Sequence, residues 1–216
     1  MSYLKGYEHG GIVLGSGMKN ASRIARVFEV VHVLSLSVWL GAVGLSGVVA
    51  GLIFPMMGKL QPTLGAYSAY EGDHALLTGG LVAGEVFLYV DTAQFICASI
   101  ALGAFITMIV AGYQISTLTR ALRCALLLLT MGLLSYHLFL LMPGMTDDLE
   151  SYWELARIGE TEQADRFKNA FMADHEKAAN SLKGLMVGVF VSLVLSVWTG
   201  VGSGMGNAPA DSSKGS

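Results

Sequence analysis

The stretch VFEVVHVLSLSVWLGAVGLSGVVAGLIF, from Val27 to Phe54, decides the fold of this chain. A helix rises about 1.5 Å per residue, so about 20 apolar residues cross a hydrocarbon layer of about 30 Å. Three more apolar blocks follow, at residues 86–112, 121–142 and 184–202. Four such blocks predict an all-α fold, an integral membrane four-helix bundle forming one transmembrane domain over residues 27–202.

The composition agrees with a membrane protein whose first partner is the lipid bilayer. Hydrophobic residues make up 53% of the chain and charged residues 13%, against about 25% charged residues in a typical soluble domain. The net charge of −3 argues against a nucleic-acid partner. Cys97 and Cys124 lie inside apolar blocks without zinc-type spacing, which indicates packing residues.

The ends of the chain differ in composition from the predicted spans. Residues 1–26 form a polar, Gly-rich arm with four cations and one carboxylate. The positive-inside tendency therefore places this arm, and after four crossings the C-terminus, in the cytoplasm, with the chain in the inner cell membrane. Residues 203–216 are rich in Gly and Ser and are predicted to be disordered.

The connection between the third and fourth apolar blocks is predicted to be an extramembrane helical segment over residues 145–183. Leu149 and Trp153 recur at the spacing of a short amphipathic helix. Gly159 marks a break, and Thr161 followed by Glu162 is typical of a new helix start. The second helix is expected to run directly into the fourth span.

Small residues punctuate the first span. Gly47 and Gly51 form a GxxxG step, which allows a second helix to approach closely. The partner is expected to be another helix of the same chain, while another subunit or a second copy is the alternative.

Ionisable residues in the first span need a reason, because each costs several kcal/mol in hydrocarbon. Glu29 and His32 open this span and are expected to reach the nearby interface. His32 also shares one helical face with Ser35, Trp39 and Ser46, and this face is predicted to point into the bundle.

The second span has polar residues in two directions. The first direction is a strip at helical spacing, expected to face the bundle interior, and it comprises Glu85, Tyr89, Thr92, Ser99, Gly103 and Thr107. Asp91 and Gln94 lie off this strip, which indicates contact with two partners or with a watery cavity. Asp91 is the costliest residue if ionised, and it is expected to lie near the headgroups, to be protonated, or to be hydrogen-bonded to a Tyr or Thr. The candidates outside the histidine set are thus His32, Trp39, Glu85 and Asp91.

Three other histidines are the candidates for binding a cofactor. Counting residues along the spans puts His74, His137 and His175 toward one side of the membrane, with His32 about 20 Å away from His137. His137 with His74 or His175 could therefore ligate a haem b. The same side could instead bind a divalent cation or protons with Asp73, Asp174 and Glu176. The simpler interpretation of His137 is a hydrogen-bonded packing residue.

The stretch HVLSLSVWLGAVGLSGVVAGLIFP, from His32 to Pro55, resembles the opening of the transmembrane-protein-205-like family. EVFLYVDTAQF and DHEKAANSLKGL, which begin at Glu85 and Asp174, resemble that family's second helix and the run before its last helix. The resemblance implies a small four-helix membrane protein, a domain of unknown function, and no chemistry. The positions that match its motifs are His32, Trp39, Gly41, Pro55, His175 and Asn180.

Three functions remain open. The leading hypothesis is a non-enzymatic accessory or scaffold protein that associates with other membrane subunits, because the sequence has no phosphate loop, HExxH or Gly-x-Ser-x-Gly motif. The second is a b-type haem or redox membrane subunit that uses His137. The third is a small transporter or proton-linked permeation protein built around Glu85 and Asp91.

Overall fold

The computed structural model describes residues 10–115 and 117–205, and these are almost entirely helical. Four helical runs are long and apolar enough to cross a membrane, which confirms the prediction of an all-α membrane bundle. The arm up to residue 9 and most of the predicted disordered tail lie outside the described residues. The elements are α1 (Gly10–Leu60), a 3₁₀ turn (Gly65–Tyr67), α2 (His74–Val110), α3 (Leu118–Ser135), a π-helical segment (Tyr136–Leu141), α4 (Met142–Arg157) and α5 (Thr161–Met205).

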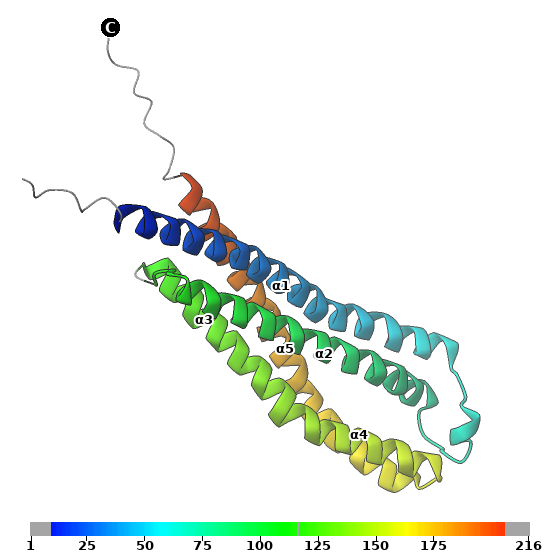
Figure 1. Cartoon of the computed structure of the whole chain (residues 1–216). Coiled ribbons are helices and arrows are strands. Elements are labelled where there is room, and N and C mark those ends of the chain that lie inside the picture. Colours follow the sequence, from blue (N-terminus) through cyan, green and yellow to red (C-terminus); the bar gives the residue numbers. More distant parts are fainter. Residues whose placement is uncertain (1–9, 116, 206–216) are drawn as a thin grey trace, which may run out of the picture.

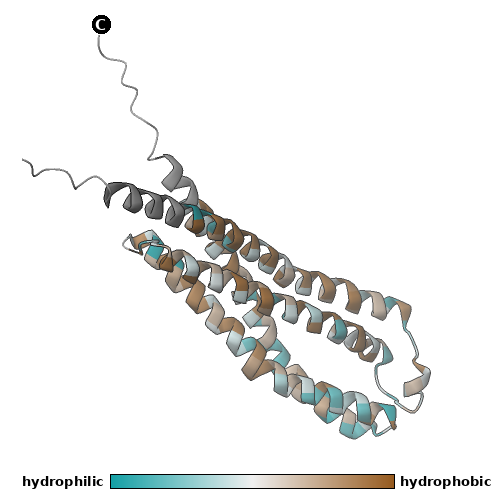
Figure 2. Cartoon of the chain, in the orientation of Figure 1, coloured by the Kyte–Doolittle hydropathy of each residue, from teal (hydrophilic) through white to brown (hydrophobic). Residues whose placement is uncertain are grey.

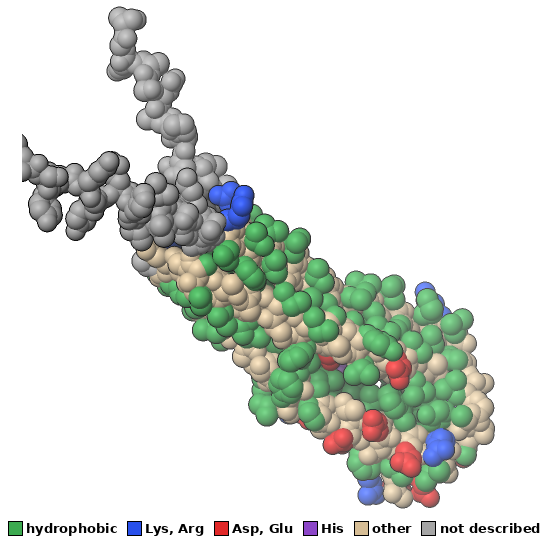
Figure 3. All heavy atoms as spheres, in the orientation of Figure 1, with side chains coloured by type: hydrophobic (Ala, Val, Ile, Leu, Met, Phe, Trp, Pro, Cys, Tyr) green, Lys and Arg blue, Asp and Glu red, His purple; other side chains and the backbone are tan. Residues whose placement is uncertain are grey.

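The helices lie side by side in one elongated bundle (Figure 1). The beginning of α1 and the end of α5 lie at one end, which we call the terminal end. At the other end, α4 packs on the first half of α5 beside the loop of residues 61–73, and we call it the hairpin end. Apolar residues dominate the length of the bundle, and hydrophilic residues gather at the hairpin end (Figure 2). The space-filling view likewise has acidic and basic side chains over the hairpin end and mainly hydrophobic ones along the bundle (Figure 3).

Two helices extend beyond their predicted spans. α2 begins at His74, where the Asp73 carboxylate caps it by accepting a hydrogen bond from the Leu76 N–H at 2.9 Å. α1 begins at Gly10, within the residues predicted to form the polar arm, and continues through Pro55 to Leu60. The turns added to α2 and to the end of α1 lie at the hairpin end, while those of α1 before Val27 lie at the terminal end. These helices are therefore longer than a single crossing requires.

The interior face of α1 follows the prediction. His32, Ser35, Trp39 and Ser46 are all buried. Trp39 lies in the main core, whose other fully packed members are Leu36, Val43, Ala98, Ala101, Phe105, Met108, Leu127, Leu134, Leu185 and Val189. The alanines of α2 have small side chains, and these permit the bulky side chains of α1 to pack against that helix.

The polar strip of α2 points the opposite way from the prediction. Tyr89 is 73% exposed, and Glu85, Thr92, Ser99 and Gly103 are also exposed. The hydroxyls of Thr92 and Ser99 donate to the carbonyls of Leu88 and Phe95 in the preceding turn. Because each hydroxyl is satisfied within its own helix, the strip needs no partner in the bundle. Asp91 and Gln94 face the interior instead.

The glycine step of α1 is also not used as expected. Side-chain atoms added at Gly47 and Gly51 would meet no atom of the described chain within 4 Å. The packed steps are two others. At Gly84, beside Gly80, an added Cβ would lie 3.2 Å from the Trp153 ring of α4. At Gly188 of α5 it would lie 2.6 Å from the Thr130 hydroxyl of α3, and Gly184 packs on α3 in the same way.

The third crossing and α4 form one continuous helical run with a π-helical segment between them. Pro143 lies two residues after the end of this segment and cannot donate a backbone hydrogen bond to Phe139. The wider π turn accommodates the proline, and the Met142 N–H bonds to the His137 carbonyl five residues earlier. Gly159 ends this run with a φ of 83°, and α5 begins at Thr161, as the sequence predicted.

Replacing Gly84 with leucine should destabilise the hairpin end. The new side chain would displace the Trp153 ring, and overpacking of this kind costs about 1–3 kcal/mol. Thermal unfolding in mild detergent should therefore show a lower Tm for Gly84→Leu. Gly103→Leu is the matched control, since Gly103 lies on the same helix with open space around it. Equal Tm values for the two variants would contradict the packing of the Trp153 ring against Gly84.

Candidate functional site

A carboxylate and an imidazole meet inside the bundle from two different helices. Asp91 projects from α2, and His137 from the π-helical segment. The His137 Nε2 atom lies 3.9 Å from Asp91 Oδ1. Gln94, one turn along α2, donates from Nε2 to the same Asp91 oxygen at 3.0 Å. On the other side, His137 Nδ1 lies 2.6 Å from the Ser181 hydroxyl of α5.

The two contacts of the Ser181 hydroxyl allow the hydrogen of the neutral His137 ring to be assigned. The Ser181 hydroxyl donates its single hydrogen to the Ala178 carbonyl at 2.8 Å. It can therefore only accept from His137, so Nδ1 is the donor. In a neutral ring the Nε2 lone pair then faces Asp91, an acceptor opposite an acceptor. One additional proton, on Nε2 or on the Asp91 carboxyl, turns this opposition into attraction.

Asp91 and His137, which we call the central pair, and their partners Gln94 and Ser181 are largely buried. His137 is 2% exposed and Gln94 is fully buried, while the side chain of Asp91 keeps 17% of its surface open. The partners of Asp91 are thus Gln94 and His137, and the expected bond to a Tyr or Thr is not formed. His137 is a hydrogen-bonded buried residue, as its simpler interpretation predicted, and it also contacts an acid.

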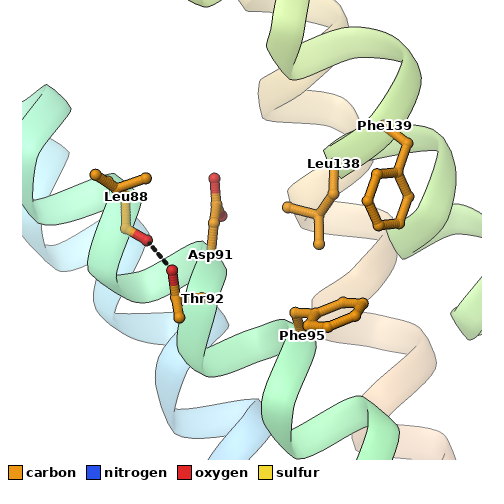
Figure 4. Close-up of a pocket in the computed structure, with 6 residues that line it drawn as sticks. All are labelled: Leu88, Asp91, Thr92, Phe95, Leu138 and Phe139. Atoms are coloured by element: carbon orange, nitrogen blue, oxygen red, sulfur yellow. Dashed lines mark hydrogen bonds between the residues drawn. The ribbon is translucent and has the colours of Figure 1, made fainter.

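The open side of Asp91 lies in a groove between α2 and the π-helical segment. The groove has a volume of about 240 Å³ and is lined by Leu88, Asp91, Thr92, Phe95, Leu138 and Phe139 (Figure 4). The rings of Phe95 and Phe139 meet edge to face, with centroids 6.1 Å apart. The Thr92 hydroxyl is engaged by the Leu88 carbonyl, so the carboxylate of Asp91 is the group left for polar recognition.

A second buried charged group lies at the terminal end. Arg123 of α3 is 1% exposed, and its Nη2 atom lies 2.8 Å from Glu29 Oε1 of α1. Its Nη1 atom donates to the Tyr113 hydroxyl and the Thr199 hydroxyl at 3.3 and 3.2 Å. His32 is also buried, with Nδ1 donating to the Ala101 carbonyl at 2.8 Å. These contacts join α1, α2, α3 and α5, and they indicate a structural clasp.

The expectation that Glu29 and His32 reach the interface is therefore wrong for His32 and incomplete for Glu29. Arg123 was not among the candidate residues. A signal was available: Glu29 and Arg123 each lie three residues or fewer inside a predicted span, at the same end of the bundle. Two opposite charges at equal depth in hydrocarbon are expected to pair.

The three histidines considered as haem ligands do not form one ligand set. His74 begins α2, seventeen residues before Asp91, which is about 25 Å along the helix. Its Nε2 atom bonds to the Tyr70 carbonyl. The His175 ring stacks on Phe171, about 9 Å of helical rise before Ser181.

The alternative of a divalent cation site finds no matching geometry. Within residues 10–115 and 117–205, no three His, Cys, Asp or Glu side chains gather as a metal site would require. Asp73 caps α2, and Asp174 pairs with Lys177 at 2.6 Å. Of the remaining candidates, Trp39 is fully buried and Glu85 is exposed on the outward strip of α2.

Comparisons with protein-family models, with curated proteins and with solved structures find no match for the chain. The resemblance to the transmembrane-protein-205-like family therefore stays a prediction.

Removing Glu29 should cost more stability than removing the whole ion pair. Glu29→Leu leaves the Arg123 guanidinium buried and unpaired, and breaking a buried pair in this way costs about 3–5 kcal/mol. Arg123→Met added to Glu29→Leu removes that unpaired charge and should restore part of the Tm. The measurement is a double-mutant cycle from thermal unfolding in detergent. Strictly additive shifts in Tm would show that the two side chains are not coupled.

Proposed function

We propose that this multi-pass membrane protein is a small proton-linked transport protein in which Asp91 and His137 bind and release a proton. The observation that carries the proposal is the contact of a carboxylate with an imidazole inside the bundle, with Asp91 Oδ1 3.9 Å from His137 Nε2 and the Ser181 hydroxyl on the other ring nitrogen. A site of this kind has one proton fewer than it needs for attraction, so taking up a proton changes the interaction between two helices.

The position of the pair supports the same interpretation. Carboxylates and histidines within spans are costly and commonly mark proton relays and transport paths. Asp91 lies five residues inside the predicted second span, about 8 Å of helical rise from its beginning. It therefore lies where a proton can arrive from water at the hairpin end.

The π-helical segment gives the site a means of responding to the proton. π turns inside α-helices are rare and occur frequently at functional sites. Here the segment begins one residue before His137 and provides two walls of the groove, Leu138 and Phe139. A change in the contact between His137 and Asp91 would therefore move the groove wall directly.

For the cellular location, we propose the inner cell membrane with both termini in the cytoplasm. The support is the excess of Lys and Arg in residues 1–26 over the single carboxylate there. The hairpin end, and with it the approach to the central pair, would then face away from the cytoplasm.

A second candidate function is a non-enzymatic accessory protein that associates with other membrane subunits or with a second copy. The observation that favours it is the open GxxxG step of α1, where Gly47 and Gly51 meet no other part of the described chain. A step of this kind suits close packing against a further helix.

Asp91→Asn should abolish proton movement through the protein. The amide has nearly the same shape as the carboxyl but cannot take up the proton that the pair needs. Proteoliposomes carrying a pH-sensitive dye inside and an imposed proton gradient would measure the flux, with and without added permeant substrate. We expect Asp91→Asn to fall to the rate of empty liposomes.

Glu85→Gln is the matched control for this experiment. It removes a carboxylate from the same helix, but Glu85 is exposed and has no described partner in the bundle. Its flux should equal that of the wild type. Unchanged flux in Asp91→Asn, or equal loss in both variants, would overturn the assignment of the proton to Asp91.

For the second candidate, Gly47→Leu should disrupt association with a neighbouring helix without unfolding the bundle. The site has room for the side chain in the isolated chain. Chemical cross-linking in native membranes should show a complex for the wild type that is lost in Gly47→Leu and retained in Val48→Leu, a neighbouring exposed position. A wild type that cross-links to nothing would count against the accessory role.

A further inference from the structure

We infer that the groove beside Asp91 binds a lipophilic organic cation, and that binding releases the proton held by the central pair. This inference rests on the proposed function, because it names the class of substrate that the proton would exchange with. It is carried by the chemistry of the groove walls and by the position of the carboxylate among them.

The groove walls are apolar and aromatic apart from Asp91 and Thr92, whose hydroxyl is bonded to the Leu88 carbonyl. Leu88, Phe95 and Phe139 are 63%, 48% and 61% exposed, and in a membrane such exposure is toward lipid. In Figure 4, Asp91 and Leu138 project into the space between α2 and the π-helical segment, with Phe95 below them. A ligand can therefore enter sideways from the bilayer and meet the carboxylate at the inner wall.

This combination of groups excludes most other ligand classes. An anion would meet the carboxylate, and a sugar or nucleotide would need several polar partners that the lining lacks. A bare divalent cation requires about six or more oxygen ligands, and here only one carboxylate is offered. An organic cation with an apolar body needs one negative charge, apolar contact area and aromatic faces, all of which are present.

The size of the groove fits one part of such a ligand. Its volume of about 240 Å³ is somewhat below the range of about 300–1,000 Å³ typical of closed small-molecule sites. The remainder of the ligand would stay in the open mouth among lipid chains. The depth of Asp91, about 8 Å inside the predicted span, matches the boundary region where amphipathic molecules lie in a bilayer.

Proton and cation compete for the same carboxylate. A protonated Asp91 carboxyl loses one proton to water as the organic cation binds, and the resulting carboxylate is paired with the cation. No electron moves and no covalent bond other than the carboxyl O–H breaks. Asp91 thus binds either the cation or the proton, and never both at once. This mutual exclusion is the basis of exchange transport.

The experiment measures binding of radiolabelled tetraphenylphosphonium to the purified protein in lipid nanodiscs. Its charge is permanent, so any proton released comes from the protein and can be measured with a pH-sensitive dye in weak buffer. Tetraphenylborate, an anion of the same shape, is the control for partition into lipid. We expect saturable binding of the cation only, with about one proton released per cation bound.

Three variants identify the site. Asp91→Asn should weaken binding at least about tenfold, since it removes the charge that pairs with the ligand. Phe139→Ala leaves the hydrogen bonds of the central pair intact and should weaken binding about three- to tenfold through loss of aromatic contact. Glu85→Gln should bind as the wild type does. Equal binding of both ions, or no effect of Asp91→Asn and Phe139→Ala in folded protein, overturns the inference.

The outcomes separate this inference from the proposed function. Asp91-dependent proton flux without cation binding would mean that the groove is filled by lipid or by another helix, and the inference fails while the proton function stands. Cation binding through Asp91 without proton flux in liposomes would support the binding site and overturn the proposed transport function.

Discussion

Inside a hydrocarbon layer no water is present to bind polar side chains, and this constraint organises the whole bundle. The chain meets it in two ways. Hydroxyls such as those of Thr92 and Ser99 bond to carbonyls of their own helix, so they can face lipid. The charged side chains of Arg123 and Asp91 instead make contacts across helices, with Glu29 and His137. The clasp around Arg123 and the central pair of Asp91 and His137 are the two results.

The two groups differ in how far their charges are compensated by an opposite charge. Arg123 has a carboxylate and two hydroxyls around it, so its charge is compensated without any added group. Asp91 and His137 lie 3.9 Å apart instead, and Asp91 opens on a groove. We therefore propose the central pair as the place where a proton or a cation acts.

The parts of the fold that could be predicted are those fixed by length and by strong periodicity. Four apolar blocks predict four crossings, and the face of α1 that carries His32 and Trp39 is buried as its spacing indicated. The polar strip of α2 was assigned to the interior because its hydroxyls were treated like Asp or Gln. GxxxG spacing was equally uninformative alone, since Gly80 and Gly84 are packed while Gly47 and Gly51 are open. Which step is used depends on partners such as Trp153, far away in sequence.

For the candidate site, Asp91 and His137 could be identified as individual residues but not as a pair. Their contact depends on the π-helical segment before Pro143, which sets the direction of His137 toward α2 and Ser181. Regular helical spacing in the sequence does not predict where a single wider π turn occurs. The pairing of Glu29 with Arg123 was within reach, because depth alone brings those two charges together.

The most direct test of the central claim is infrared difference spectroscopy of the protein in lipid while the pH is changed. The carbonyl stretch of a protonated carboxylic acid lies apart from the bands of ionised carboxylates and amides. The account predicts a pH-dependent carboxylic-acid band that persists in Glu85→Gln, disappears in Asp91→Asn and changes when His137 is replaced by Gln. A spectrum in which Asp91→Asn removes no pH-dependent band would contradict the claim that this pair exchanges a proton.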